Sequence, residues 1–105
     1  MSNNAPLSHV VCFKLKDASA DSITSFVAAC KKHLDIPALQ QHFYVTTLAH
    51  YTRPVNDREF DVALNIVFKT PAAHDEYQAG AAHHAFMHEC EPLWSKARVF
   101  DSYVT

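Results

Sequence analysis

The sequence of 105 residues contains one glycine, Gly80, and no apolar run close to the ~20 residues that span a bilayer. Lysine and arginine number 9 against 11 aspartates and glutamates, so the formal charge is −2 and no concentrated basic face is expected. The first residues, MSNNAPLSH, lack the basic region followed by an apolar one that a signal peptide requires. These absences predict a cytoplasmic protein with neither a nucleic-acid nor a membrane partner.

The cysteines provide no pairing pattern. Cys12, Cys30 and Cys90 are odd in number and show no C-x-x-C spacing. Free cysteine behaves as a small hydrophobic residue in reducing compartments, so we expect reduced, buried thiols. A nucleophilic cysteine needs a partner histidine and a partly open, electropositive setting, and this role remains an alternative for Cys90.

The composition that is present is typical of one globular domain. Apolar residues make up 49% of the chain and charged residues 19%, which argues against disorder. The length also predicts a single domain. We expect an N-terminal tail over residues 1–7 and the folded domain over residues 8–105.

Hydrophobic periodicity predicts the order of the elements. Alternating segments indicate strands over residues 9–16, 42–52, 59–70 and 97–104. Helical spacing indicates a helix over residues 20–35 and a helical region from residue 71 to about residue 96. The order β-α-β-β-α-β predicts an α+β, ferredoxin-like fold, in which a four-stranded antiparallel sheet carries both helices on one face.

The other sheet face is expected to remain partly apolar. It carries Val10, Cys12, Ala63 and Val67, and exposed apolar patches commonly mark interfaces. Two such sheets packed face to face form a dimeric α/β barrel with two-fold symmetry. We therefore predict that the protein's partner is a second copy of itself.

The last helical region is expected to consist of two pieces. Pro71 suits the first turn of a short helix, and Gly80 suits the left-handed position that ends one. A second helix is expected from about residue 82 to residue 95, with Pro92 bending it or ending it early.

The histidines of the second helix are predicted to face different ways. An apolar stripe is formed by Phe86, Cys90, Leu93 and Trp94. His83 lies three residues before Phe86 and so falls on the apolar side. His84 and His88 share a more polar face with Glu91; their spacing can bind a metal ion, but no third ligand is apparent. We expect that face to be solvated, and we expect no metal and no cofactor.

His83 has two interpretations. It is either a core histidine with satisfied ring nitrogens or an acid–base group that lines a pocket between helix and sheet. His9 faces the helices from the first strand, and Tyr77 offers a phenolic donor from the short helix. A few polar groups around an apolar space are typical of a small-molecule pocket. We expect its substrate-binding lining to include His9, Phe13, Val62 and Phe86.

The chain resembles the stress-responsive dimeric α/β-barrel (Dabb) family over nearly its whole length. Tyr77, His83 and Phe86 match the family's pattern, whereas Gly80 and the following alanine replace its His-Pro pair. His9 matches the histidine that commonly opens the first strand. Asp101 matches an aspartate of the last strand.

The resemblance to a plant polyketide cyclase of this family implies a site. It implies that His83 is the base of an intramolecular aldol condensation, that Tyr77 holds the substrate and that His9 lines the site. Val62 stands where that enzyme has another pocket histidine. We thus expect a cofactor-free cyclase or isomerase acting on a small enolisable carbonyl compound, with Tyr77 and His9 as hydrogen-bonding groups for the enolate oxygen. The alternatives are a non-enzymatic stress-responsive binding or structural protein and a cofactor-free monooxygenase of aromatic polyketides.

Overall fold

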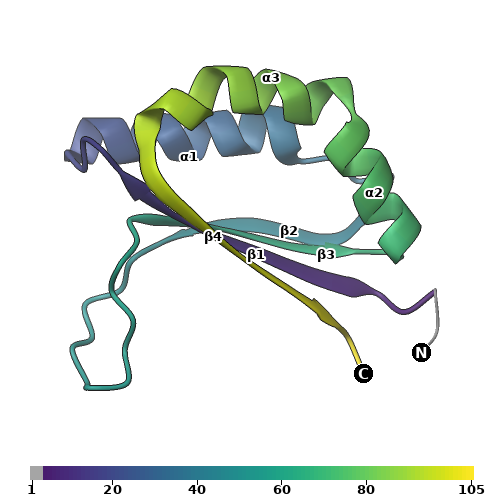
Figure 1. The fold of residues 1–105 in the computed structure, drawn as a ribbon, viewed down its shortest axis with the longest axis horizontal. Coiled ribbons are helices and arrows are strands. Elements are labelled where there is room, and N and C mark those ends of the chain that lie inside the picture. The colour runs from purple at the N-terminus through teal and green to yellow at the C-terminus, as the bar shows by residue number, and fades with distance from the viewer. Residues whose placement is uncertain (1–3) are drawn as a thin grey trace.

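The computed structural model describes residues 4–105 and has the element order β-α-β-β-α-α-β (Figure 1). The predicted tail, residues 1–7, includes residues 1–3, which lie outside the described part. The elements are β1 (Leu7–Leu15), α1 (Ala20–Leu34), β2 (Gln40–Thr47), β3 (Val62–Phe68), α2 (Pro71–Ala79), α3 (Ala81–Cys90), a 3-10 turn η1 (Glu91–Leu93) and β4 (Trp94–Tyr103).

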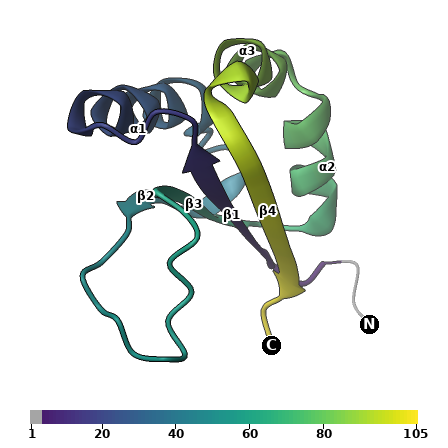
Figure 2. The same ribbon diagram turned by 60° about the vertical axis from the view of Figure 1, so that its left-hand side comes forward.

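The four strands form one antiparallel sheet with the order β2-β3-β1-β4. The helices cover one of its faces, and the connection between β2 and β3 extends away from them on the other side (Figures 1 and 2). The predicted ferredoxin-like architecture is therefore confirmed. The register places His9 of β1 beside Ile66 of β3 and Asp101 of β4.

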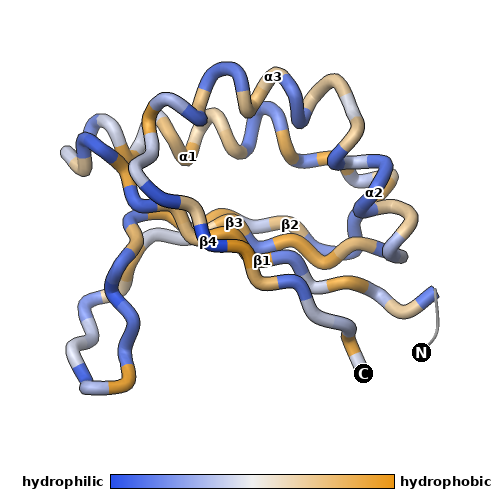
Figure 3. Tube along the Cα trace, in the orientation of Figure 1, coloured by the Kyte–Doolittle hydropathy of each residue, from blue (hydrophilic) through white to orange (hydrophobic). Residues whose placement is uncertain are grey.

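Burial along the central strands follows the predicted alternation. In β1, every second residue from Leu7 to Leu15 is buried, and the residues between them are partly exposed. The buried side meets α1, which begins where the Ser19 hydroxyl accepts a hydrogen bond from the Ser22 amide. Apolar residues concentrate in β1 and β3, whereas the loop over residues 48–61 is mostly hydrophilic (Figure 3). The core consequently lies between the sheet and the helices.

β2 and the last helix each end five residues before the furthest predicted end, and the helix does so because Pro92 ends it early, which was one of the two expected effects of that proline. β2 ends at Thr47, so the residues up to 52 belong to the loop between β2 and β3. Asp57 of that loop accepts hydrogen bonds of 2.6 and 3.1 Å from Arg98 of β4. The last helix ends at Cys90, because Pro92 allows only the 3-10 turn before β4 begins. Leu93 is 49% exposed and is not a core residue, while Trp94 packs on the core from the start of β4.

Gly80 separates α2 from α3, as predicted, but not in a left-handed conformation. Its φ of −77° and ψ of 156° are extended, and its amide donates to the Tyr77 carbonyl as the C-cap of α2. A single extended residue, Gly80, is therefore both the C-cap of α2 and the N-cap of α3. No helix within residues 4–105 has the length and apolarity needed to cross a membrane.

The sheet face away from the helices carries the predicted apolar residues. Val10, Cys12 and Val67 are partly exposed, and Ala63 is buried. Two larger side chains join them: Tyr44 is 56% exposed and Phe100 is 51% exposed. This surface is called the open sheet face below.

Candidate active site

A cavity of about 200 Å³ lies between the helices and the sheet. Strands β1, β3 and β4 line it from the sheet, and α1, α2 and α3 line it from the helices. Its lining is mainly apolar, with polar groups from three elements. The lining residues are His9, Val11, Phe13, Leu34, Leu64, Tyr77, Gln78, His83, Phe86, Met87, Trp94, Ala97 and Val99. We call it the central cavity.

The central cavity brings together the predicted site residues with one exception. The predicted His9, Phe13, Tyr77, His83 and Phe86 all line it. Val62 does not line it: this side chain is fully buried in β3.

The break at Gly80 positions the two polar groups of the helices. Tyr77 lies in the last turn of α2 and His83 in the first turn of α3, so the change of direction between the helices turns both rings inward. Their ring centroids are 5.1 Å apart in an edge-on arrangement. Nδ1 of His83 is buried and has no hydrogen-bond partner in the described part of the chain. Such an atom costs free energy unless a ligand or a water molecule satisfies it.

The surroundings of these rings determine their protonation. Burial lowers the pKa of His83, and the nearby His84, His9 and His74 act in the same direction. The imidazole is therefore neutral near pH 7. Burial raises the pKa of Tyr77 well above its usual value, so its phenol stays protonated. The cavity thus contains a neutral base beside a hydrogen-bond donor.

His9 is 3% exposed and is held by a carboxylate. Its Nδ1 donates to Oδ1 of Asp101, its cross-strand neighbour, at 2.5 Å. Burial lowers the pKa of His9, and the hydrogen bond to Asp101 opposes that effect. With the proton on Nδ1, Nε2 of the neutral ring carries a lone pair and accepts hydrogen bonds. Neutral His9 is thus unsuited to donate to an enolate oxygen from Nε2, in contrast to the expectation.

Sequence reasoning missed His74. Its ring lies 5.1 Å from that of His9 and 5.3 Å from that of Phe68, measured between centroids. The spacing of three residues from Tyr77 along α2 was an available signal, because positions i and i+3 share a helix face. The register that brings Asp101 beside His9 had no such local signal.

An aromatic group closes one end of the central cavity. Phe13 of β1 lies 4.9 Å from Phe26 of α1 and 4.9 Å from Trp94 of β4, between ring centroids. Phe86 of α3 completes the group at 6.0 Å from Phe26. Trp94 contributes because β4 begins earlier than predicted.

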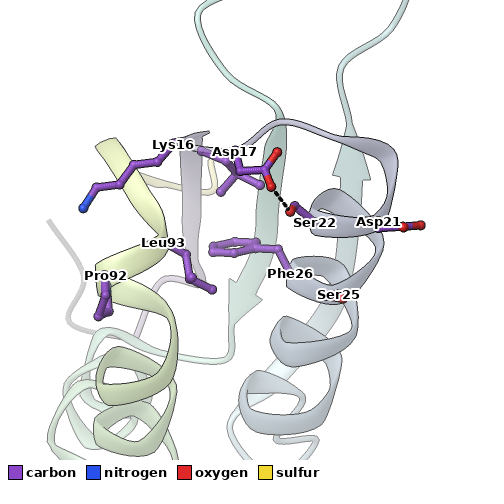
Figure 4. Close-up of a pocket in the computed structure, with 9 residues that line it drawn as sticks. Lys16, Asp17, Asp21, Ser22, Ser25, Phe26, Pro92 and Leu93 are labelled. Carbon is purple, nitrogen blue, oxygen red and sulfur yellow. Dashed lines mark hydrogen bonds between the residues drawn. The ribbon is translucent and has the colours of Figure 1, made fainter.

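A second hollow, of about 440 Å³, lies beyond Phe26 between α1 and η1 (Figure 4). Phe26 reaches toward Leu93 there, and Asp17 accepts a hydrogen bond of 2.8 Å from the Ser22 hydroxyl. Hydrogen bonds from the Ser19 amide and the Ser22 hydroxyl lower the pKa of the fully exposed Asp17. These contacts order the start of α1, and the hollow's lining includes no histidine or cysteine.

The remaining candidates for chemistry are less suited to it. Cys90 is fully buried, and its burial raises the pKa of the thiol to about 11, so the nucleophilic thiolate does not form near neutrality. Cys30 is buried too, with a pKa raised to about 12. His84 and His88 are exposed on α3, as the helical spacing predicts.

Three comparisons with known proteins bear on this arrangement. A family model described as the stress responsive A/B barrel domain matches residues 7–104. No curated protein sequence matches the chain.

Solved structures with the same fold cover nearly all of the chain. A ferredoxin-like Dabb family protein from Mesorhizobium loti is 25% identical, with a TM-score of 0.78 and coverage of 96% of this chain and 98% of that one. The hydroxynitrile lyase of Passiflora edulis is 19% identical, with a TM-score of 0.77 and coverage of 97% and 95%. A dimeric ferredoxin-like protein of unknown function from Thermobifida fusca is 15% identical, with a TM-score of 0.76 and coverage of 99% and 95%.

Proposed function

The chain belongs to the stress responsive A/B barrel domain family, and we propose that it is a cofactor-free enzyme for proton transfer on a small enolisable carbonyl compound. The observation that carries the proposal is the unpartnered, buried Nδ1 of His83 in the same cavity as Tyr77. A buried polar atom without a protein partner is rare in folded proteins, and a ligand in the cavity can satisfy it.

The proposed reaction follows from the states of the two groups. Neutral His83 takes a proton from the carbon next to the carbonyl, and the Tyr77 hydroxyl donates a hydrogen bond to the enolate oxygen that forms. An isomerase then returns the proton from His83 to another carbon. In a cyclase the enolate carbon attacks a second carbonyl of the same molecule, and the new alkoxide takes the proton. His9 accepts a hydrogen bond from a hydroxyl of the ligand.

The volume of the central cavity favours a small ligand. Its volume of about 200 Å³ lies below the ~300–1,000 Å³ that is common for ligand pockets. A short ketone or diketone suits that space better than a long linear polyketide. The proposed similarity to olivetolic acid cyclase, a polyketide cyclase of the family, therefore concerns the histidine base and the tyrosine phenol and does not extend to the substrate.

The second candidate is a protein that binds a ligand without transforming it, or whose cavity is vestigial. The size of the cavity favours this reading, because ligand pockets commonly measure ~300–1,000 Å³ and this one measures about 200 Å³.

The Passiflora edulis protein of the same fold is a hydroxynitrile lyase, which supports the enzyme class in general terms.

We further propose that the protein is a cytoplasmic homodimer that pairs through the open sheet face. Strand register aligns Tyr44, Asn65, Val10 and Phe100 in one row across that face. The two largest members of the row are half exposed in the single chain, and covering them removes apolar surface from water. The Thermobifida fusca neighbour is described as dimeric, which supports a homodimer.

Turnover of a panel of small ketones and diketones tests the catalytic proposal. The wild-type protein is expected to convert at least one compound in buffer with EDTA, and His83→Ala is expected to be ~10²–10⁴-fold slower with an unchanged circular dichroism spectrum. His84→Ala is the matched control, because the neighbouring histidine is exposed. Equal rates for wild type and His83→Ala would show that His83 is not the base, and ligand binding without turnover would favour the second candidate.

A further inference from the structure

Three side chains from three elements form a cluster at one end of the central cavity. They are His9 of β1, His74 of α2 and Asp101 of β4. One ring nitrogen of each histidine and one carboxylate oxygen of the aspartate all lie within 4.8 Å of one another. The proposed proton transfer does not use His74.

The fold holds the three groups in place. Antiparallel pairing sets His9 opposite Asp101, and both side chains point to the helix-covered face. The first turns of α2, which Thr70 caps, bring His74 down over them until its ring lies 5.1 Å from that of His9. His9 is almost fully buried, whereas the side chain of Asp101 is 42% exposed, so the cluster has an ordered interior and a side open to solvent.

A second observation concerns the support around His74. Its Nδ1 donates to Oδ1 of Asp75 at 3.1 Å, and the Gln78 amide lies 3.5 Å from its Nε2. A histidine that donates one N–H to a carboxylate presents the lone pair of its other nitrogen. Histidines that bind metals are usually held in this way by an outer carboxylate or carbonyl.

We propose that His9, His74 and Asp101 form a binding site for a divalent first-row transition metal ion. Two imidazoles and one carboxylate are the donor set that Zn²⁺, Fe²⁺ and Co²⁺ accept, with water in the positions that the protein leaves open. For both groups to bind one ion, His9 coordinates through Nδ1 and carries its proton on Nε2 instead. The carboxylate and the imidazole, 2.5 Å apart, then separate slightly. The exposed aspartate supplies that movement.

The site is separate from the proposed base. His83 and Tyr77 take no part in it, and the catalytic assays above are run in EDTA, so either proposal can fail while the other holds. His9 belongs to the lining of the central cavity, so a bound ion has a position from which a ligand's oxygen can reach it.

Titration of the metal-free protein with Co²⁺ tests the site, because Co²⁺ bound to protein ligands absorbs visible light. The expected result is one Co²⁺ per chain, displaced by Zn²⁺. Asp101→Asn and His74→Phe are each expected to weaken binding at least ten-fold. The phenylalanine keeps the ring contacts of His74 with Phe68 and His9. The control is the double variant His84→Ala/His88→Ala, which removes the exposed pair of histidines on α3 and is expected to bind as the wild type does.

Two results would overturn the proposal. One is the absence of Co²⁺ absorption changes up to millimolar metal. The other is binding that the double control variant abolishes and that Asp101→Asn and His74→Phe leave intact, since the ion would then belong to α3. If His74→Phe fails to fold by circular dichroism, Asp101→Asn decides alone, because the Asp101 side chain is 42% exposed and asparagine has nearly the same shape.

Discussion

At His83, a side chain proposed to act on a ligand lowers the stability of the fold. Its Nδ1 is buried without a partner, and a buried unsatisfied polar atom typically costs ~1–3 kcal/mol. A core histidine kept for packing would have its nitrogens satisfied, which is the structural interpretation that the sequence left open. The arrangement instead resembles a group held ready for a ligand, at some cost to the fold.

Replacing His83 with phenylalanine is therefore expected to leave the free energy of unfolding unchanged or to raise it by up to ~1 kcal/mol, because it removes the orphaned nitrogen. Urea unfolding measures this change. Phe86→Ala is the matched comparison on the same helix: Phe86 is 2% exposed, and its truncation is expected to cost ~3–5 kcal/mol. A loss of more than ~2 kcal/mol in His83→Phe would indicate a structural role.

The same residue predicts how stability depends on pH. The pKa of His83 in the folded protein lies below its usual value of 6.5, so the unfolded chain binds more protons than the folded one as the pH falls through that value. Stability contributed by neutral His83 is thus complete above pH 6.5 and is lost as the pH drops toward the folded pKa. Unfolding of wild type and His83→Phe in urea from pH 8 to pH 5, with EDTA, is expected to show the steeper acid loss in the wild type. Parallel curves would contradict this.

At the scale of the elements, α2 and its cap determine where the site's groups lie. Thr70 Oγ1 accepts a hydrogen bond of 3.1 Å from the Ala73 amide, at the start of the helix that carries both His74 and Tyr77. The Thr70 cap therefore helps to hold the start of α2, and with it His74 and Tyr77, in position.

Thr70→Ala is expected to lower the free energy of unfolding by ~1 kcal/mol, because the Ala73 amide loses its acceptor. Thr70→Ser keeps the hydroxyl and is expected to remain within a few tenths of a kcal/mol of the wild type. Thermal and urea unfolding of both variants provide the measurement. If the two variants lose equal stability, the methyl group rather than the cap is what matters.

How much of these elements the sequence predicts depends on how local the signal is. The alternation in β1 and the helical stripe of α1 are strong local patterns, and both elements appear within two residues of the expected bounds. The conformation of Gly80 was predicted wrongly, because a lone glycine suggests a left-handed residue. Its extended backbone does not require glycine, but a Cβ there would lie only 3.3 Å from the carbonyl oxygens of Glu76 and Tyr77. The pairing of His9 with Asp101 depends on the register of two strands 92 residues apart, which no local pattern encodes.

The residues of the site can also be divided into those that a local sequence pattern predicts and those that it does not. Tyr77, His83 and Phe86 are brought together by spacing that can be read along a helix, whereas Trp94 enters the cavity because β4 begins earlier than expected. Val62 was expected in the lining and lies wholly in the core of β3. Which of several inward-facing residues borders an empty space depends on the packing of all of them.

At the scale of the whole molecule, the open sheet face is the feature that a single chain leaves unsatisfied. Phe100→Asp places a charge at the β4 end of the row that runs across it, and burying an unpaired charge is costly. We expect the wild type to be a dimer at micromolar concentration and Phe100→Asp to be a folded monomer, by size-exclusion chromatography with light scattering. Lys32→Asp, on the exposed side of α1, is the control and is expected to remain dimeric. A monomeric wild type would contradict the proposed assembly.

The central claim is that the cavity removes a proton from carbon with His83. Exchange of α-hydrogens for deuterium, followed by ¹H NMR for small ketones in D₂O with EDTA, measures that step without knowledge of the final product. The wild type is expected to accelerate exchange of at least one ketone, and His83→Phe is expected to be ~10²-fold or more slower while His84→Ala matches the wild type. Exchange at the same rate in wild type and His83→Phe, or no exchange above buffer for any ketone that binds, would contradict the claim.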